Sequence, residues 1–162
     1  MKRILLLLSG LLLIWVQTSA IQTFSVWGVK PNLLLMGVIL SAMRWISPGM
    51  LVFACLAGLS QDAYSHGMLG VYGLSFLGTA GLAYVGGRSF FENNWLFIAL
   101  LVSLLTLAEG LMALAILRVV EGQIPVMGWF FHLTLPVALY NGVLTFPALW
   151  LLTRLARLVE RD

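Results

Sequence analysis

The sequence predicts an all-α, polytopic membrane protein with six transmembrane helices. Of its 162 residues, 61% are hydrophobic and 9% charged, and the mean hydropathy is +1.02. Soluble domains carry about a quarter charged residues, and a globule of this size cannot hide so much apolar surface. A lipid bilayer as solvent removes the conflict. We therefore expect one integral membrane domain over residues 1–162, with no soluble domain of functional size.

Apolar runs that suit a transmembrane helix occur six times. A helix needs about 20 apolar residues to cross roughly 30 Å of hydrocarbon. We expect spans near residues 4–21, 32–45, 48–64, 68–87, 95–117 and 129–153. The polar stretch at 61–67 separates two crossings, with a re-entrant pair as the alternative. The first run also resembles a signal peptide, but its apolar stretch continues into Ile21, so we interpret it as an uncleaved helix.

Positive charge predicts the orientation. With the N-terminus in the cytoplasm, the outer loops hold only Lys30 and Arg118, and the inner segments hold the other basic residues. Those are Lys2, Arg3, Arg44, Arg88, Arg154, Arg157 and Arg161. An excess of basic residues marks the cytoplasmic side, so both termini are expected there. Because the basic residues are scattered singly, the net charge of +3 does not indicate nucleic-acid binding.

Two acidic residues fall within or at the end of predicted spans. Asp62 lies at the outer end of the third span, and Glu109 lies deep in the fifth. A charge in hydrocarbon costs several kcal/mol unless it has a partner. Each acid is therefore either a polar functional site or a group that fixes helix packing, for Glu109 with Arg118 or Asn141. We expect Asp62 to accept hydrogen bonds from the turn at 65–67 and to organise the outer rim.

Small residues recur at spacings that leave one face of a helix without large side chains. Gly67, Gly70 and Gly73 are three apart, and Gly58 follows Ala54 by four. Such faces let helix backbones approach closely. They serve either contacts inside the protein or a groove for a partner helix.

Patterns typical of enzymes and cofactor sites are lacking. The sequence holds no Gly-rich phosphate loop with Lys, no nucleophile elbow and no metal-ligand spacing. His66 and His132 are expected at outer span ends as interfacial residues, and the single Cys55 cannot form an internal disulfide. We predict no catalytic residue, no cofactor and no metal.

Three segments resemble the bacterial family of the rod shape-determining protein MreD. The first is 30–35, in which Pro31 and Asn32 precede a leucine run. The second is 58–70, with Gly-Leu, then Asp62, then Leu-Gly. The third begins with Asn141 in 140–144 and continues with Pro147. Some members have Asp beside the proline where this chain has Asn32, so a role that needs charge there is not carried over.

The resemblance implies a non-enzymatic component of the cell-elongation machinery in the bacterial inner membrane. It implies binding to MreC and, indirectly, a link from MreB to RodA and its penicillin-binding transpeptidase. It also implies a fold similar to the six-helix substrate-binding subunit of energy-coupling-factor vitamin transporters, and such a subunit is the alternative function. Glycines 58, 70 and 73 are then expected docking strips for MreC's helix. The partner-binding or structural candidates are Pro31, Asn32, Gly58, Asp62, Gly67, Gly70, Gly73, Glu109, Asn141 and Pro147.

Overall fold

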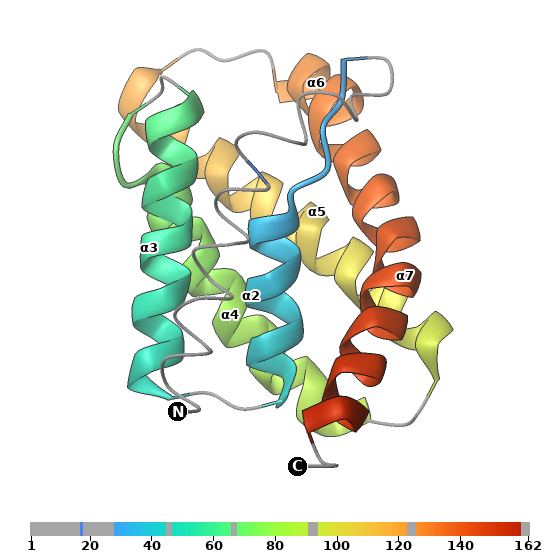
Figure 1. Cartoon of the computed structure of the whole chain (residues 1–162). Helices are drawn as coiled ribbons and strands as arrows, with labels where there is room; N and C mark the ends of the chain where they lie inside the picture. Colours follow the sequence, from blue (N-terminus) through green and yellow to red (C-terminus); the bar gives the residue numbers. More distant parts are fainter. Residues whose placement is uncertain are drawn as a thin grey trace.

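The computed structural model describes residue 17 and residues 28–44, 47–65, 68–90, 94–122 and 126–159. Its elements in these ranges are all helical (Figure 1). They are α2 (Leu33–Arg44), α3 (Pro48–Ser65), α4 (Val71–Phe90), α5 (Trp95–Glu121), α6 (Val126–Trp129), the π-helical η2 (Phe130–Thr134) and α7 (Leu135–Val159). The first expected span, 4–21, lies outside the described residues except for Gln17.

Local sequence signals explain most helix ends. α3 begins at Pro48, where a missing N–H costs nothing. The Asn94 side chain accepts a hydrogen bond from the Leu96 N–H at 3.1 Å and so caps the start of α5. α5 ends at Glu121, and the next residue, Gly122, has a φ of 85° that suits glycine. The starts of α2, α3 and α5 therefore fall within one residue of those expected.

The sixth expected span, 129–153, is not one regular helix. It consists of α6, then η2, then α7, which continues to Val159. The Leu135 N–H donates to the carbonyl of Phe130, five residues back, as in a π-helix. Pro136 follows directly and has no N–H for the usual bond to His132. The proline accounts for the interruption, which the sequence analysis overlooked.

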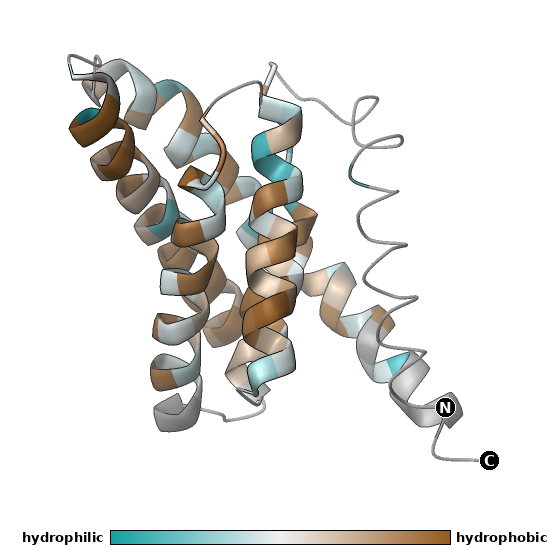
Figure 2. Cartoon of the chain, turned by 90° about the vertical axis from the view of Figure 1, so that its left-hand side faces the viewer, coloured by the Kyte–Doolittle hydropathy of each residue, from teal (hydrophilic) through white to brown (hydrophobic). Residues whose placement is uncertain are grey.

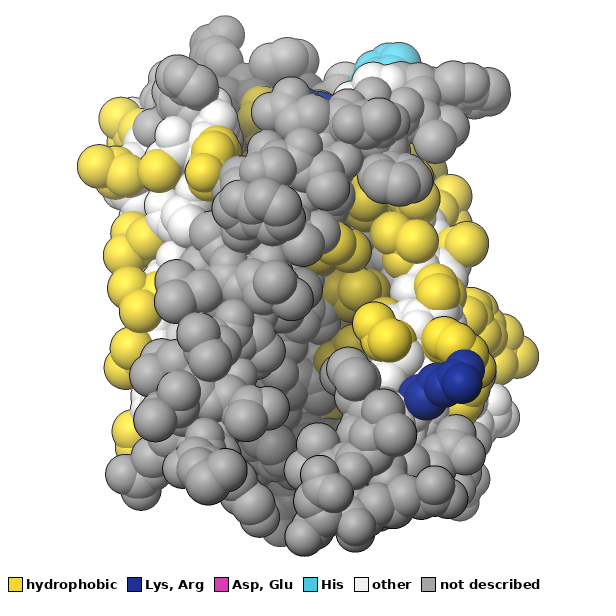
Figure 3. Space-filling view, in the orientation of Figure 1, with side chains coloured by type: hydrophobic (Ala, Val, Ile, Leu, Met, Phe, Trp, Pro, Cys, Tyr) yellow, Lys and Arg dark blue, Asp and Glu magenta, His cyan; other side chains and the backbone are white. Residues whose placement is uncertain are grey.

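The outer surface of the bundle is apolar. Helical stretches Trp95–Val120 and Met127–Leu151 are long and apolar enough to cross a membrane, and Leu33–Met43 is a shorter apolar helix. Figure 2 shows hydrophobic residues along much of each helix, and Figure 3 shows them over α3 and α7 on the visible flanks. On α5, Leu96, Leu100 and Leu104 recur every four residues and are more than half exposed. Soluble monomers rarely expose such faces, so the surface indicates a membrane protein.

The centre of the core is α2. Leu34, Leu35, Val38, Ile39 and Ala42 have no exposed surface. The helix contacts α3, α4, α5 and α7 (Figure 1). A helix surrounded in this way buries apolar residues on nearly all sides.

Glycines bring α4 close to its neighbours. A Cβ at Gly58 would overlap the carbonyl of Tyr72 and lie 2.6 Å from Cα of Gly73, and one at Gly87 would lie 2.8 Å from Cα of Met43. Gly58 and Gly73 therefore serve contacts inside the protein. The docking strip expected at these two glycines is not an open surface in this structure.

Candidate functional site: a polar cavity at one end of the bundle

Asp62 holds the turn between α3 and α4. Its side chain is 1% exposed. The N–H groups of Gly70 and Tyr72 each donate to its carboxylate at 2.9 Å, and that of Gly73 does so at 3.3 Å. The first amides of a helix have no partner within it, and negative charge is favourable there. The acid therefore caps α4 across the turn.

The described donors to Asp62 lie further along the chain than the expected turn at 65–67. They are Gly70, Tyr72 and Gly73, whereas 66 and 67 lie outside the described residues. Gly70 has a φ of 103°, which few residues other than glycine adopt. The turn at 68–70 consequently delays the start of α4 to Val71, three residues after the expected 68.

A second buried polar cluster joins three helices. The Asn32 N–H donates to Oδ1 of Asn141 at 3.0 Å, and Nδ2 of Asn141 donates to the Thr106 hydroxyl at 3.3 Å. Asn32 also caps α2 by accepting a hydrogen bond from the Leu35 N–H at 3.0 Å. Asn141 has no exposed surface. The start of α2, the middle of α5 and the first half of α7 are thus fixed together by neutral side chains, without need of a charge at Asn32.

Gln17 supports the same end of α2. Its Nε2 donates to the carbonyl of Pro31 at 3.1 Å, and its Oε1 accepts from the Leu33 N–H at 2.9 Å. The sequence analysis missed both Gln17 and Thr106. Thr106 is a polar residue within an apolar run and Gln17 directly follows one, which is the signal that would have found them.

Glu109 is the unusual member of the site. It lies on α5 and is 5% exposed. Within the described part of the chain, its Oε1 is the one buried side-chain polar atom without a hydrogen-bond partner. The expected partners do not bond to it: Arg118 is exposed, and Asn141 bonds to Asn32 and Thr106 instead. The pairing with Arg118 or Asn141, one of the two interpretations of Glu109, is thus not among the contacts that the structure describes.

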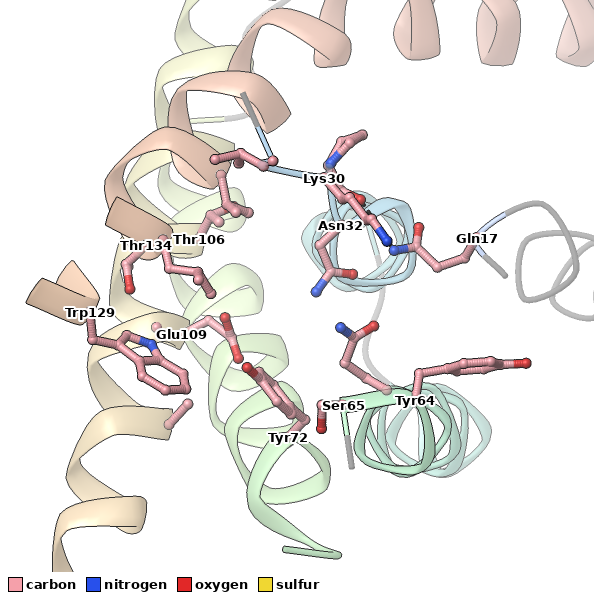
Figure 4. A pocket seen from close by; sticks show the side chains of 18 residues that line it. Gln17, Lys30, Asn32, Tyr64, Ser65, Tyr72, Thr106, Glu109, Trp129 and Thr134 are labelled. Atoms are coloured by element: carbon pink, nitrogen blue, oxygen red, sulfur yellow. Dashed lines mark hydrogen bonds between the residues drawn. The ribbon is translucent and has the colours of Figure 1, made fainter. Parts of the chain in front are cut away.

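A cavity of about 320 Å³ opens beside Glu109. Figure 4 shows the Glu109 carboxyl and the Tyr72 hydroxyl directed toward one another, with the Trp129 ring on the other side of Glu109. Thr134 of η2 also lines the cavity, and a Cβ at Gly110 would overlap its side chain. This close contact holds η2 against α5 immediately next to the acid.

Comparison with family models identifies the chain's relatives. Residues 1–159 match the model of the rod shape-determining protein MreD. The chain belongs to this family. No curated protein and no solved structure gives a match. Membership of the MreD family makes the chain a component that determines rod shape, and its apolar helices agree with a membrane location.

The remaining MreD candidates lie apart from the cavity or outside the described residues. Pro147 is exposed inside α7, and His132 is exposed on η2. Gly67 and His66 are outside the described ranges. Within those ranges, no group of three or more His, Cys, Asp or Glu residues could hold a metal ion. The polar chemistry that the structure describes is thus concentrated around Asp62, the Asn32 cluster and Glu109.

Proposed function

We propose that this MreD-family chain is a non-enzymatic, multi-pass component of the elongation machinery in the bacterial inner membrane. It binds MreC, a single-span protein with a large extracytoplasmic part, and helps to link MreB filaments to peptidoglycan synthesis by RodA and its penicillin-binding transpeptidase. The observation that carries this proposal is the family match over residues 1–159.

The proposed topology has six crossings and both termini in the cytoplasm. Helices of 18 and 20 residues, α3 and α4, are about 27 and 30 Å long at 1.5 Å per residue. These lengths favour two crossings over a re-entrant pair. The guanidinium carbon of Arg154 lies 5.1 Å from the centre of the Trp150 ring near the end of α7. Such a pair suits a membrane interface. With that end of α7 in the cytoplasm, α6 at the opposite end of the bundle (Figure 1) would lie on the outer side, together with the cavity that Trp129 lines.

Asp62 is proposed as the organiser of the outer rim. By holding Gly70, Tyr72 and Gly73, it fixes the short connection between α3 and α4. The membrane-proximal part of MreC would meet this connection as it leaves the bilayer. Loss of the carboxylate would loosen the rim without altering the apolar surface that faces lipid.

The test is retention of MreC together with cell shape. A tagged full-length chain would replace the native MreD of a rod-shaped bacterium and be purified from its membranes in mild detergent. We expect the wild type to retain MreC and support rods, and Asp62→Ala to impair both more than Glu109→Gln does. Membrane abundance of each variant is the control for folding. Failure of the wild type to retain MreC removes the main support, and wild-type behaviour of both variants excludes a role for either acid.

One observation favours the alternative, a substrate-binding subunit of a vitamin transporter. The cavity of about 320 Å³ lies within the size range of ligand sites. This alternative requires a vitamin that copurifies with the chain and is detected by mass spectrometry. A chain that retains a vitamin but not MreC would reverse the order of the two proposals.

A further inference from the structure

We propose that the cavity around Glu109 is a binding site for a small ligand that carries a primary ammonium group. This site is independent of MreC binding and adds a ligand to a chain whose proposed role is assembly. The ligand's N–H groups donate to the carboxylate of Glu109 and to nearby hydroxyl oxygens. Its cationic end lies against the aromatic rings of Tyr72 and Trp129.

Oε1 of Glu109 lacks a hydrogen-bond partner among the residues that the structure describes. A buried carboxylate without a hydrogen-bond donor is strongly unfavourable, and buried side-chain polar atoms nearly always have a partner. Among the buried side-chain atoms that the structure describes, Oε1 of Glu109 is the exception. The neighbouring polar groups are already used: Asp62 by α4, and Asn141 by Asn32 and Thr106. Among the described residues, Glu109 is thus left with a buried acceptor oxygen that no donor of the chain satisfies.

The cavity wall passes from exposed residues to buried ones: Lys30, Tyr64 and Ser65 are exposed, whereas Thr106 and Glu109 are buried. Figure 4 shows the labelled side chains arranged around this space. A ligand can thus enter from the end of the bundle and reach Glu109 without displacing a helix. The volume of about 320 Å³ limits it to a small molecule or the head of a larger one.

The residues that line the cavity determine which ligand charge it favours. Among the described residues that line the cavity, Glu109 is the only acid, and none is a histidine or a cysteine. Lys30 also lines the cavity, but at its exposed end. At the buried end, a single carboxylate disfavours anions and supplies too few ligands for a divalent metal ion. An ammonium group fits better there, because its three N–H donors match the Glu109 carboxylate and the hydroxyls of Tyr72 and Thr134.

The aromatic residues add a second reason for a cation. Tyr72 and Trp129 both pack against the apolar cluster of Val71, Ala113 and Leu117. Their side chains flank that of Glu109 in Figure 4. Cations are attracted to the faces of Trp and Tyr rings. A carboxylate between two aromatic residues therefore combines charge, hydrogen bonding and ring contact for one ammonium group.

Two sources offer this chemistry, a free small amine and the headgroup of phosphatidylethanolamine. The full-length chain would be placed in nanodiscs of phosphatidylglycerol only, which carry no amine. Ethanolammonium chloride would then be titrated against a sodium chloride reference and followed by saturation-transfer NMR. In a second arm, nanodiscs with equal phosphatidylethanolamine and phosphatidylglycerol would be analysed by native mass spectrometry for retained lipid.

Matched variants identify the site. Glu109→Gln keeps the size of the side chain and removes its charge. Glu121→Gln makes the same change at the end of α5, about 18 Å further along the helix axis. Trp129→Leu removes the aromatic ring and leaves both Glu109 and Glu121 in place. Tetramethylammonium, which has no N–H, serves as the control ligand.

We expect saturable binding in at least one arm. Glu109→Gln should weaken it at least tenfold, equivalent to about 1.4 kcal/mol, Trp129→Leu at least threefold, and Glu121→Gln less than twofold. A saturation-transfer signal from ethanolammonium indicates that the ligand is a free amine. Selective retention of phosphatidylethanolamine without such a signal indicates that the ligand is the lipid headgroup. The proposal is overturned by absence of saturable binding in both arms, by equal binding to a folded Glu109→Gln chain, or by equal binding of tetramethylammonium.

Discussion

Replacement of Asp62 by alanine tests the role of the outer turn most directly. The change removes one acceptor group that serves three backbone N–H donors at 2.9, 2.9 and 3.3 Å. A hydrogen bond to a charged group contributes about 1.5–3 kcal/mol. The two short bonds alone give roughly 3 kcal/mol at the lower limit. Because the donors share one carboxylate and the turn can relax, we expect a total loss of about 3–5 kcal/mol.

The assay is reversible unfolding in mixed micelles, with sodium dodecyl sulfate as denaturant and helical circular dichroism as the signal. Asp62→Asn retains one acceptor oxygen, so its free energy of unfolding should lie between those of Asp62→Ala and the wild type. Thr79→Val is a control, since Thr79 is buried on α4 and bonds only to the carbonyl of Ser75 one turn earlier. A loss below about 1 kcal/mol for Asp62→Ala, the size of an ordinary substitution, would refute the argument that this carboxylate holds the turn.

Two further predictions concern contacts between helices, both measured by the same unfolding assay. Gly58→Ala places a Cβ against the backbone of α4 and should destabilise the bundle by at least about 2 kcal/mol. Its control is Gly81→Ala on α4, where a Cβ meets open space and the change should be neutral or stabilising by up to about 1 kcal/mol. Equal effects of the two substitutions would contradict the close approach of α3 and α4 at Gly58. Asn141→Ala removes the acceptor of the Asn32 N–H and should cost about 1–3 kcal/mol. Thr106→Val removes the longer bond from Asn141 and the local bond from its own hydroxyl to the carbonyl of Val102, but it leaves the bond between Asn32 and Asn141. A larger loss than for Asn141→Ala would therefore contradict the central place of Asn141.

Apolar periodicity and proline position predicted where most helices lie. The start at Pro48 and the start at Trp95 both follow from neighbouring residues alone. The interruption in the last span could also have been predicted, because Pro136 lacks the N–H that a continuous helix needs. It was missed because hydropathy does not change at that position.

The polar contacts were less accessible to sequence reasoning. Asp62 was correctly singled out as an acid at a helix end, but its donors depend on where the next helix begins. Asn32 and Asn141 meet across 109 residues, and no local pattern in the sequence specifies that pair. Glu109 was expected to have a partner on general grounds. Its free oxygen follows from helix packing, which directs Asn141 to Asn32 and leaves Arg118 at the surface.

The bond between Asn32 and Asn141 also sets an order of events during synthesis. Chains are made at about 5–20 residues per second, so the 109 residues between them take roughly 5 to 20 s to appear. The contacts of Asp62 join residues only 8 to 11 apart and can form within about 2 s of its synthesis. The hairpin of α3 and α4 can therefore form early, whereas the backbone N–H of Asn32 finds its acceptor only after the last helix has been inserted. A ribosome that stalls before Asn141 leaves the backbone N–H of Asn32 without its acceptor.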